Sequence, residues 1–453
     1  MKRYSLVTVL MFLPIMAHAT NGYFAHGIGI KNRALAGAGV ALPQDAMASA
    51  TNPAGMAFVG NRFDIGAVLF RPDRGYSAGT SLANGNGGAF TIGPDSDDSG
   101  DATFLIPSFG VNYMLTENDA IGLSVYGNGG LNTTYDGGTA TFDPDGPGPA
   151  PVSQLPGTFG GGTVGVDLFQ IFFNFSYAHK FSEKLSLGIS PIFVVQGFRS
   201  NGLDAFAGFT KSFAESGGSA LPENLTSNGQ DYSYGGGVQV GLLAKDIIGS
   251  ADVGLSYRSK MYMDEFDDYS DLFAEEGDFD VPPTLWAGFS VDLTDKLTLV
   301  ADYQKIWYEE VDAISNDVQN LYACPTAGLG GVDLDSCLGG DNGGGFGWDN
   351  IDIFKVGLQW QTHSDVTMRF GYSHSDNPID DDQALFNILA PGVIEDHITI
   401  GATIKTNGMG EINLEAMHAL HNSVKGTNPF DPTQEIRIQM DQFEVGIGWS
   451  KEF

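Results

Sequence analysis

Hydrophobic and polar residues alternate with a period of two along most of this chain. Phe169 and Ile171, for example, flank the polar Gln170, and the stretches 297–304 and 397–404 repeat the pattern. Successive side chains of a β-strand point to opposite faces, so each stretch presents one apolar face and one mixed face. The alternation therefore predicts an all-β protein.

The connections between these stretches are of two kinds. Some are short and polar, and these lie within 115–121, 181–187, 293–299 and 361–367. Others are long, acidic and rich in Gly, Asp and Ser, as in 84–101, 136–162, 264–280 and 326–347. A short polar connection between two alternating stretches predicts a tight hairpin. Short turns at one end and long loops at the other are typical of outer-membrane β-barrels.

About fourteen strands are predicted, an even number as in bacterial single-chain barrels. They lie near residues 62–72, 103–115, 119–135, 166–181, 184–200, 229–245, 251–264, 282–293, 296–311, 347–362, 365–376, 395–406, 409–424 and 434–453. In lipid every backbone N–H and C=O needs a partner, so we expect the sheet to close into a transmembrane antiparallel β-barrel. In the last strand the apolar residues change face near Asp441, where we expect a β-bulge.

The first residues have the features of an export signal. Lys2 and Arg3 precede a short apolar run, and Ala17 and Ala19 fit the small-residue cleavage pattern. The run is shorter than the roughly 20 apolar residues of a membrane-spanning helix. We therefore expect residues 1–19 to be a cleaved signal peptide, and no later stretch has enough uninterrupted apolar residues for a transmembrane helix.

Residues 20–60 show no period-two alternation. Many of them are small, and 44–51 is predicted as a short helix that ends at the turn Asn52-Pro53-Ala54-Gly55. A compact, weakly charged segment ahead of a barrel suggests a partly helical hatch that plugs the lumen, and a periplasmic tail is the alternative. The expected organisation is a signal peptide (1–19), a hatch (20–60) and a barrel (61–453).

The composition narrows the function further. Gly accounts for 62 of the 453 residues, and charged residues are only 17%, against about 25% in ordinary soluble domains. The formal net charge of −33 repels phosphate backbones, so nucleic acid is not an expected partner. The two cysteines, Cys324 and Cys337, predict one disulfide in an exported protein, with two free thiols as the alternative. No metal site and no other cofactor is expected.

Acidic residues are concentrated in the stretch 264–280. It lacks the spacing of an EF-hand, so a solvated loop is the main interpretation. Binding of divalent cations shared with lipopolysaccharide is the alternative, because hard cations prefer carboxylate ligands.

Several motifs along the chain resemble those of one known family. They are Asn21-Gly22-Tyr23-Phe24, Gly37-Ala38-Gly39-Val40-Ala41, Asp45-Ala46, Asn52-Pro53-Ala54-Gly55-Met56, Pro283-Thr284-Leu285-Trp286-Ala287-Gly288, Arg369-Phe370-Gly371-Tyr372, Asn377-Pro378, His397 with Gly401, and the C-terminal Phe453. Together they are similar to the FadL family of outer-membrane long-chain fatty acid transporters (OmpP1/FadL/TodX), which includes relatives that take up toluene and other hydrocarbons. The resemblance covers essentially the whole mature chain; the N-terminal motifs are specific, and the strand motifs alone are weak.

The resemblance implies a fourteen-stranded barrel with an N-terminal hatch, and a route for a ligand. A hydrophobic molecule is caught among the extracellular loops and passes to an apolar pocket in the lumen. It then leaves sideways through a gap in the wall after the hatch rearranges. Asn52, Pro53, Ala54 and the following Gly55 match the hatch motif that lies beside this gap in the family.

The gap in the family lies where the third strand kinks, which corresponds to residues 119–135 here. This stretch contains Gly127, Gly129 and Gly130. Glycines permit a bulge and weaken pairing between strands. The alternative is that these glycines only end the strand at its loop.

Candidate pocket residues come from the hatch and from two strands. Tyr23 and Phe24 belong to the first hatch motif, and the alternation turns Phe172 inward, where packing against the hatch is the alternative to ligand contact. The resemblance places a ligand-facing Arg at the end of the fifth strand, and Arg199 matches that position. An apolar pocket favours greasy solutes by about 25 cal/mol per Å² of apolar area removed from water.

The family's second basic residue has no clear counterpart, because residues 346–353 are acidic. Arg258 and Lys305 are further candidates for binding a fatty-acid carboxylate. Because the chain lacks a clear match to this basic residue, neutral hydrocarbons are an alternative class of ligand.

We therefore expect a non-enzymatic channel in the outer membrane of a Gram-negative bacterium. Long-chain fatty acids are its expected ligands, and aromatic or aliphatic hydrocarbons are the alternative. An outer-membrane lipase is less favoured, because the chain has no Gly-x-Ser-x-Gly or His-Glu-x-x-His motif, and a general porin or adhesin is a further alternative. The other expected partners are lipopolysaccharide, outer-membrane lipids and the barrel assembly machinery, around a monomer.

Overall fold

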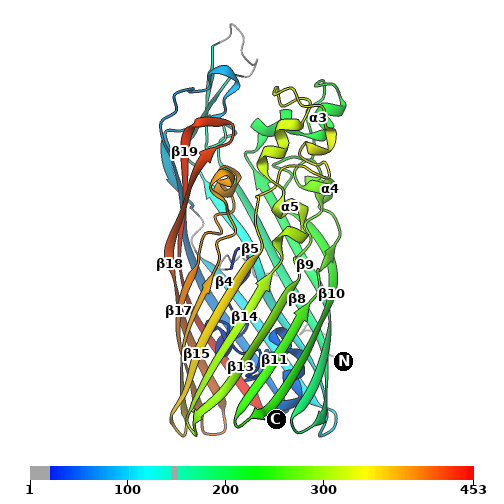
Figure 1. The fold of residues 1–453 in the computed structure, drawn as a ribbon, viewed down its shortest axis with the longest axis vertical. Coiled ribbons are helices and arrows are strands. Elements are labelled where there is room, and N and C mark those ends of the chain that lie inside the picture. The colour runs from blue at the N-terminus through cyan, green and yellow to red at the C-terminus, as the bar shows by residue number, and fades with distance from the viewer. Residues whose placement is uncertain (1–20, 101–102, 144–150) are drawn as a thin grey trace, which may run out of the picture.

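The chain forms a closed antiparallel barrel of fourteen strands (Figure 1). It is described here from a computed structural model, which covers residues 21–100, 103–143 and 151–453. The signal peptide expected at 1–19 lies outside these residues. No helix within the described ranges is long and apolar enough to cross a membrane.

Each barrel strand pairs with its neighbours in sequence. The strands are β1 (Arg62–Ala78), β4 (Phe104–Met114), β5 (Asp119–Tyr135), β8 (Val164–Ser182), β9 (Leu185–Asn201), β10 (Asp231–Ile248), β11 (Ala251–Arg258), β13 (Thr284–Thr294), β14 (Leu297–Ile306), β15 (Ile351–His363), β16 (Val366–Ser375), β17 (Asp396–Thr406), β18 (Gly410–Asn428) and β19 (Asp431–Glu452). The last strand pairs with the first along its length, from Arg62↔Glu452 to Ala78↔Ile436, which closes the barrel. The predicted strand number and barrel class are confirmed.

The two faces of the wall differ as the alternation predicts. On β8, Phe175 is 54% exposed on the outside, whereas its neighbours Asn174 and Ser176 are buried inside. On β19, Ile447 is 59% exposed and Gly448 is buried. The exposed apolar side chains form the outer surface that lipid would solvate.

The β-bulge expected in β19 near Asp441 is wrong. Ile436, Ile438 and Met440 are buried, and Gln442 on the same parity is buried as well, so the strand keeps its phase. The apolar residues of β19 change from the inner to the outer face because the surroundings of the strand change along its length. The interior is apolar near the loop end, whereas the exterior is apolar near the turn end.

The irregularity lies instead in the neighbouring strand β18. Ala419 pairs with Gln442 and Asn422 pairs with Met440, so two residues of β18 stand opposite the single Asp441. This is the two-against-one pattern of a β-bulge.

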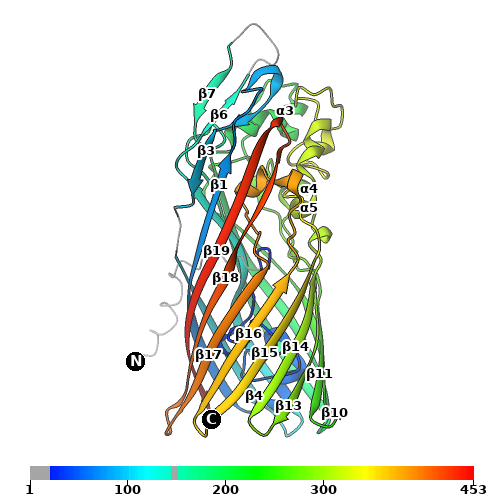
Figure 2. The same cartoon turned by 60° about the vertical axis from the view of Figure 1, so that its left-hand side comes forward.

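The long connections lie at the end of the barrel opposite the short turns. They are folded and are not open loops (Figures 1 and 2). They contain strands β2 (Thr91–Ile92), β3 (Asp95–Asp98), β6 (Thr139–Phe142), β7 (Ser153–Pro156) and β12 (Tyr262–Met263), helices α3 (Lys211–Glu215), α4 (Ala274–Gly277) and α5 (Asp312–Ser315), and 3-10 turns η2 (Asn86–Gly88), η3 (Asp204–Phe209), η4 (Asp267–Tyr269), η5 (Tyr308–Glu310), η6 (Val318–Ala323), η7 (Leu334–Ser336), η8 (Asp381–Gln383) and η9 (Phe386–Ile388). The predicted disulfide between Cys324 and Cys337 is present in this region.

The N-terminal segment, residues 21–60, lies inside the lower part of the barrel (Figure 1). It contains α1 (Ile30–Arg33), α2 (Ala48–Thr51) and η1 (Pro53–Phe58), so the helix predicted over 44–51 is shorter than expected. Glycines in the wall let its backbone approach closely. A Cβ on Gly188 would lie 2.3 Å from the carbonyl carbon of Pro53, and one on Gly254 would lie 2.3 Å from the Val40 oxygen.

Candidate functional site

An apolar cavity lies beneath the folded loops. Its space is about 520 Å³, which includes the part open to solvent. All of its lining residues are apolar or glycine, and they include Phe198, Leu203, Phe206, Phe273, Phe346 and Phe386. A ligand that enters this cavity has its apolar area removed from water, and no side chain of the lining offers it a hydrogen bond.

The lining residues come from loops far apart in the sequence. Phe206 belongs to η3, and its ring centroid lies 5.4 Å from that of Phe159 and 5.2 Å from that of Phe386 in η9. Phe273 precedes α4 and lies 4.7 Å from Phe198 of β9. The cavity was not predicted, because the long connections were described only as acidic and rich in Gly, Asp and Ser, and the stretch 264–280 was interpreted as a solvated loop. Their large aromatic residues were the available signal.

Three of the four predicted pocket residues lie together, but outside this cavity lining. Tyr23 and Phe24 are buried in the N-terminal segment, and Phe172 is buried on the inner face of β8. Arg199 is separate from them: its side chain is 48% exposed and forms an ion pair with Asp167 at 3.1 Å. Arg199 therefore supplies no cation to the cavity lining.

A chain of aromatic rings connects the cavity to the N-terminal segment. Phe273 of the cavity lies 4.9 Å from Phe279, and Phe279 lies 6.2 Å from Tyr23. Tyr23 in turn lies 5.0 Å from Phe24. These centroid distances are those of packed aromatic side chains, so a continuous apolar surface runs downward from the loops.

A carboxyl pair flanks this chain of rings in the loop after α4. Asp280 forms an ion pair with Lys260 at 2.9 Å and accepts a hydrogen bond from the Met263 N–H at 2.7 Å. Burial raises the pKa of the Asp278 carboxyl to about 8, and the neighbouring Asp280 carboxylate adds to the shift. Asp278 is therefore held protonated beside Phe279 when the loop is folded at neutral pH.

The loop around Asp278 is expected to open at high pH. The pKa of Asp278 in the folded loop lies above its ordinary value of about 3.9. The neutral Asp278 carboxyl therefore stabilises the folded loop fully below a pH of about 3.9, and this contribution is lost as the pH rises through about 8. Hydrogen exchange of residues 264–281 should accelerate between acidic and alkaline buffer beyond the intrinsic base catalysis. The variant Asp278→Asn should lose this extra dependence. An identical pH response in both proteins would contradict the assignment.

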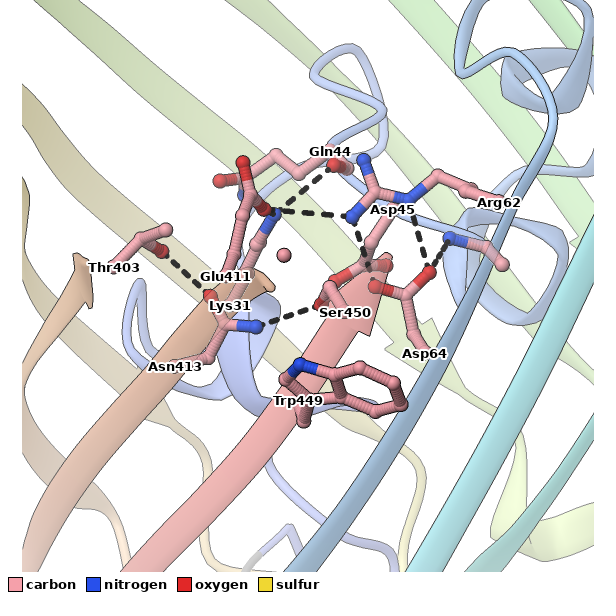
Figure 3. A network of polar contacts seen from close by, with 12 residues as sticks. Lys31, Gln44, Asp45, Arg62, Asp64, Thr403, Glu411, Asn413, Trp449 and Ser450 are labelled. Atoms are coloured by element: carbon pink, nitrogen blue, oxygen red, sulfur yellow. Dashed lines mark hydrogen bonds and ion pairs between the residues drawn. The ribbon is translucent and has the colours of Figure 1, made fainter. Parts of the chain in front are cut away.

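Charged side chains tie the N-terminal segment to the wall near the turn end (Figure 3). Lys31 pairs with Glu411 of β18 at 2.6 Å. Arg62 pairs with Asp64 at 2.9 Å, and the same Asp64 accepts a hydrogen bond from the Ala46 N–H at 2.8 Å. The contacts join α1 and the residues before α2 to two strands, β18 and β1, which lie on either side of β19.

Two further contacts are more deeply buried. Arg33 donates to both carboxylate oxygens of Glu444 at 2.8 and 2.7 Å, and both side chains are almost inaccessible. On the opposite wall, Asp302 of β14 accepts hydrogen bonds from the N–H groups of Gly39 and Val40 at 2.7 and 2.9 Å. Charge-assisted bonds of this kind are the stronger ones in proteins, so they fix the segment across the lumen.

The Asn52-Pro53-Ala54-Gly55 motif is held to the wall of the barrel by hydrogen bonds. Asn52 Nδ2 donates to the carbonyl oxygens of Val40 and of Leu242 in β10, at 2.8 and 3.0 Å, and Asn52 Oδ1 caps η1 by accepting from the Ala54 N–H. Ser186 of β9 donates to the Ala54 carbonyl. The motif is therefore bonded to β9 and β10, and η1, which begins at Pro53, also packs against β8 and the kinked strand β5.

The glycines of the third strand form a bulge and do not end the strand. In β5, Gly127 pairs with Ile171 and Gly129 with Gln170, which leaves Asn128 as the extra residue, and pairing with β8 continues to Tyr135. On its other edge β5 pairs with β4 only as far as Ser108↔Tyr126. Beyond that pair the two strands separate.

The N-terminal segment covers the free edge of β5 at this bulge. The Ala25 N–H donates to the Asn128 carbonyl at 2.8 Å, and the Gly130 N–H donates to the Tyr23 carbonyl at 3.0 Å. A Cβ on Gly129 would lie 2.0 Å from the Tyr23 oxygen, so this close approach requires glycine. Tyr23 to Ala25 are therefore bonded to the edge of β5 at the bulge, where β4 no longer pairs with it.

Residues 16–424 match the family model described as outer membrane protein transport protein (OMPP1/FadL/TodX). This match spans most of the chain. The protein belongs to the OMPP1/FadL/TodX family. The barrel is therefore an outer-membrane transporter for hydrophobic molecules.

Solved structures of the family share the fold at low sequence identity. The toluene transporter TodX of Pseudomonas putida is 18% identical with a TM-score of 0.62, and 94% of this chain and 99% of that chain are covered. A FadL homologue of Pseudomonas aeruginosa is 15% identical, with a TM-score of 0.63 and coverage of 95% and 100%. The toluene transporter TbuX of Ralstonia pickettii is 17% identical, with a TM-score of 0.59 and coverage of 94% and 99%. No curated protein matches significantly in sequence.

Proposed function

We propose that this member of the OMPP1/FadL/TodX family takes up long-chain fatty acids. Capture occurs in the loop cavity, a rearrangement of residues 20–60 follows, and the ligand leaves sideways between β4 and β5. The wholly apolar lining of the cavity is the observation that carries the proposal. Each Å² of apolar ligand area buried there contributes about 25 cal/mol, which a water-filled pore does not offer.

Residues 20–60 act as a hatch in this proposal. The loop cavity is the apolar entrance, and the edge of β5 that no longer pairs with β4 lies below it. Residues 20–60 separate the two. Residues at two places would have to move: the Asn52-Pro53-Ala54-Gly55 gate against β9 and β10, and Tyr23 and Phe24 at the kink formed by Gly127, Gly129 and Gly130. A ligand then reaches lipid through the wall without crossing an aqueous pore.

Neutral aromatic hydrocarbons are the second candidate ligands. Among the described residues no cation lines the loop cavity, and the solved relatives of similar fold include toluene transporters and a monoaromatic hydrocarbon channel. Competition separates the two candidates. Toluene should not displace bound laurate from the purified protein at equal concentration if fatty acids are the ligands, because toluene buries less apolar area.

Uptake by cells tests the proposal itself. A strain that lacks this protein and any paralogue should import labelled oleate more slowly and grow more slowly on it as carbon source. Expression of the wild-type chain should restore both rates. Equal oleate import with and without the protein would overturn the proposal.

We also propose that the protein acts as a monomer without enzymatic activity, surrounded by lipopolysaccharide and other outer-membrane lipids. The C-terminal Phe453 is the signal we expect the barrel assembly machinery to read. Purified protein should not hydrolyse lipid esters. Ester hydrolysis that survives repurification would favour a lipase instead.

The double variant Asn52→Ala, Pro53→Ala is expected to impair uptake while the barrel still inserts. It removes the cap of η1 and the two Asn52 donor bonds, and loss of a cap alone costs about 1 kcal/mol. We expect a severalfold lower rate of oleate import at an unchanged amount of folded barrel, judged by heat-dependent gel mobility. Wild-type import by the double variant would show that these residues are not a gate.

A further inference from the structure

A histidine and two carboxylates meet on the barrel wall at the loop end of β16 and β17. His374 of β16 stands directly opposite Asp396 of β17, and Glu395 immediately precedes that strand. One donor atom from each of the three side chains lies within 4.8 Å of the other two. Within the described ranges no other group of three or more His, Cys, Asp or Glu side chains has this spacing.

The three donors have the composition of a zinc site. Zn²⁺ binds imidazole nitrogen and carboxylate oxygen, and open zinc sites have three protein ligands and leave a further position to water. The side chains of His374 and Asp396 are 48% and 32% exposed, so they can rotate toward an ion and leave room for water beside it. The imidazole nitrogen disfavours Ca²⁺ and Mg²⁺, which prefer oxygen ligands.

The two carboxylates share a single neighbour that can offset their charge. His374 Nδ1 lies 3.0 Å from Asp396 Oδ1. The Glu395 side chain has no hydrogen bond or ion pair with another residue in the described part of the chain. Two carboxylates at this separation repel each other, and a divalent cation between them replaces the repulsion by attraction to both.

The turn end of the barrel offers a comparison, because it has a similar pair without the third ligand. There His179 Nδ1 lies 2.8 Å from Asp119 Oδ1, and a tyrosine hydroxyl donates to the same carboxylate. At the loop end Asp396 likewise accepts from the Tyr372 hydroxyl at 2.6 Å. A histidine, a carboxylate and a tyrosine therefore recur at both ends, and Glu395 is what distinguishes the loop end.

We propose that His374, Glu395 and Asp396 bind one divalent metal ion of the zinc class. The Tyr372 hydroxyl orients the Asp396 carboxylate, as hydrogen-bond partners of metal ligands commonly do. The proposal does not depend on which molecule the barrel transports. The sequence did not indicate the site, because His374 and Asp396 are 22 residues apart and only the pairing of β16 with β17 brings them together.

The ion joins the two ends of the segment between β16 and β17. His374 lies near the end of β16, and Glu395 ends the segment that contains η8 and η9. Phe386 and Leu389 of this segment line the loop cavity. A metal ion held by ligands from both ends therefore fastens the base of a segment that forms part of the cavity wall.

Titration of the untagged full-length protein in detergent with Zn²⁺, after treatment with a chelator, tests the site. The wild type should bind one Zn²⁺ per chain, and Ca²⁺ at equal concentration should not displace it. His374→Gln and Glu395→Gln should each weaken binding by at least about tenfold, because loss of a residue that only orients a ligand already costs about 10–100-fold. The matched control His179→Gln should bind Zn²⁺ as the wild type does.

Several outcomes would overturn the proposal. They are no Zn²⁺ binding by the wild type, displacement by Ca²⁺, and binding that survives both His374→Gln and Glu395→Gln, which would indicate an adventitious surface ion only. Hydrogen exchange of residues 376–395 should slow when Zn²⁺ is added to the wild type and should not change in Glu395→Gln. Exchange that stays the same in the Zn²⁺-bound wild type would contradict the fastening of this segment.

Discussion

Replacement of Arg33 by Met is expected to raise the steady ion conductance of the purified barrel in a planar bilayer by about tenfold or more. The exchange leaves the Glu444 carboxylate buried without its partner, at a cost of about 3–5 kcal/mol. Each 1.4 kcal/mol is about a factor of ten in an equilibrium, so the closed position of the hatch should lose its large majority. The wild-type barrel, with its lumen filled, should carry little current.

A second exchange checks that charge, and not shape, is responsible. Adding Glu444→Gln to the Arg33→Met variant removes the unpaired charge and should return the conductance most of the way to the wild-type level. The exposed Arg71→Met serves as the matched control and should have no effect. Low conductance of Arg33→Met in folded, inserted protein would show that this ion pair does not hold the hatch.

Replacement of Phe206 by Asp is expected to lower oleate import and laurate affinity by roughly tenfold or more. Phe206 is buried, lines the loop cavity and packs against the rings of Phe90, Phe159 and Phe386. A carboxylate in this lining retains water and removes apolar area that the ligand would cover, at about 25 cal/mol per Å². The effect should be on capture, so it should appear in binding as well as in transport.

The variant Phe206→Leu controls for packing. It keeps an apolar side chain of similar burial and should retain import within a few fold of the wild type. Heat-dependent gel mobility shows whether each variant forms the barrel. Full import by a folded Phe206→Asp protein would mean that the cavity is not on the ligand's path.

The strands and their order could be predicted from the sequence, because a barrel in lipid permits few arrangements. Within the membrane every backbone group needs a partner and every outward side chain meets hydrocarbon, so the alternation seen at Phe169 to Tyr177 has a single interpretation. The disulfide could be predicted for a similar reason, since an exported chain with two cysteines in one loop offers one pairing.

The alternation led to a wrong prediction where the surroundings of the two strand faces change along the strand. Above the membrane the outer surface is polar and the interior is apolar, as at Arg437 and Ile438 of β19. The prediction assumed one environment along the whole of β19 and therefore required a β-bulge near Asp441. The structure has no bulge in β19 at this residue. The chemistry of the two faces inverts while the backbone continues without interruption.

The sites could be predicted only in part, because they are made by residues distant in sequence. The motifs predicted Asn52 and Tyr23 as hatch residues, a role that stays a prediction, but they did not indicate which strands each one contacts. The loop cavity joins η3, η9 and the residue before α4, a meeting that no local pattern records. Arg258 was one basic residue among several, and the sequence did not indicate that its guanidinium is buried between the rings of Phe24 and Phe172.

The account depends on movement of the hatch, and an engineered disulfide tests that movement. A Cβ on Gly110 of β4 would lie 3.1 Å from the Cβ of Ala46, a few tenths of an ångström short of disulfide geometry. The pair Ala46→Cys, Gly110→Cys therefore locks the hatch to the wall when it is oxidised. The described chain has no free cysteine to compete with this bond.

The decisive measurement is oleate import by cells that carry this variant, before and after reduction, with wild-type cells treated alike to correct for the Cys324–Cys337 bond. We expect the oxidised variant to import no faster than cells that lack the protein, and the reduced variant to regain most of the wild-type rate. Import at the wild-type rate with the hatch locked would contradict the account.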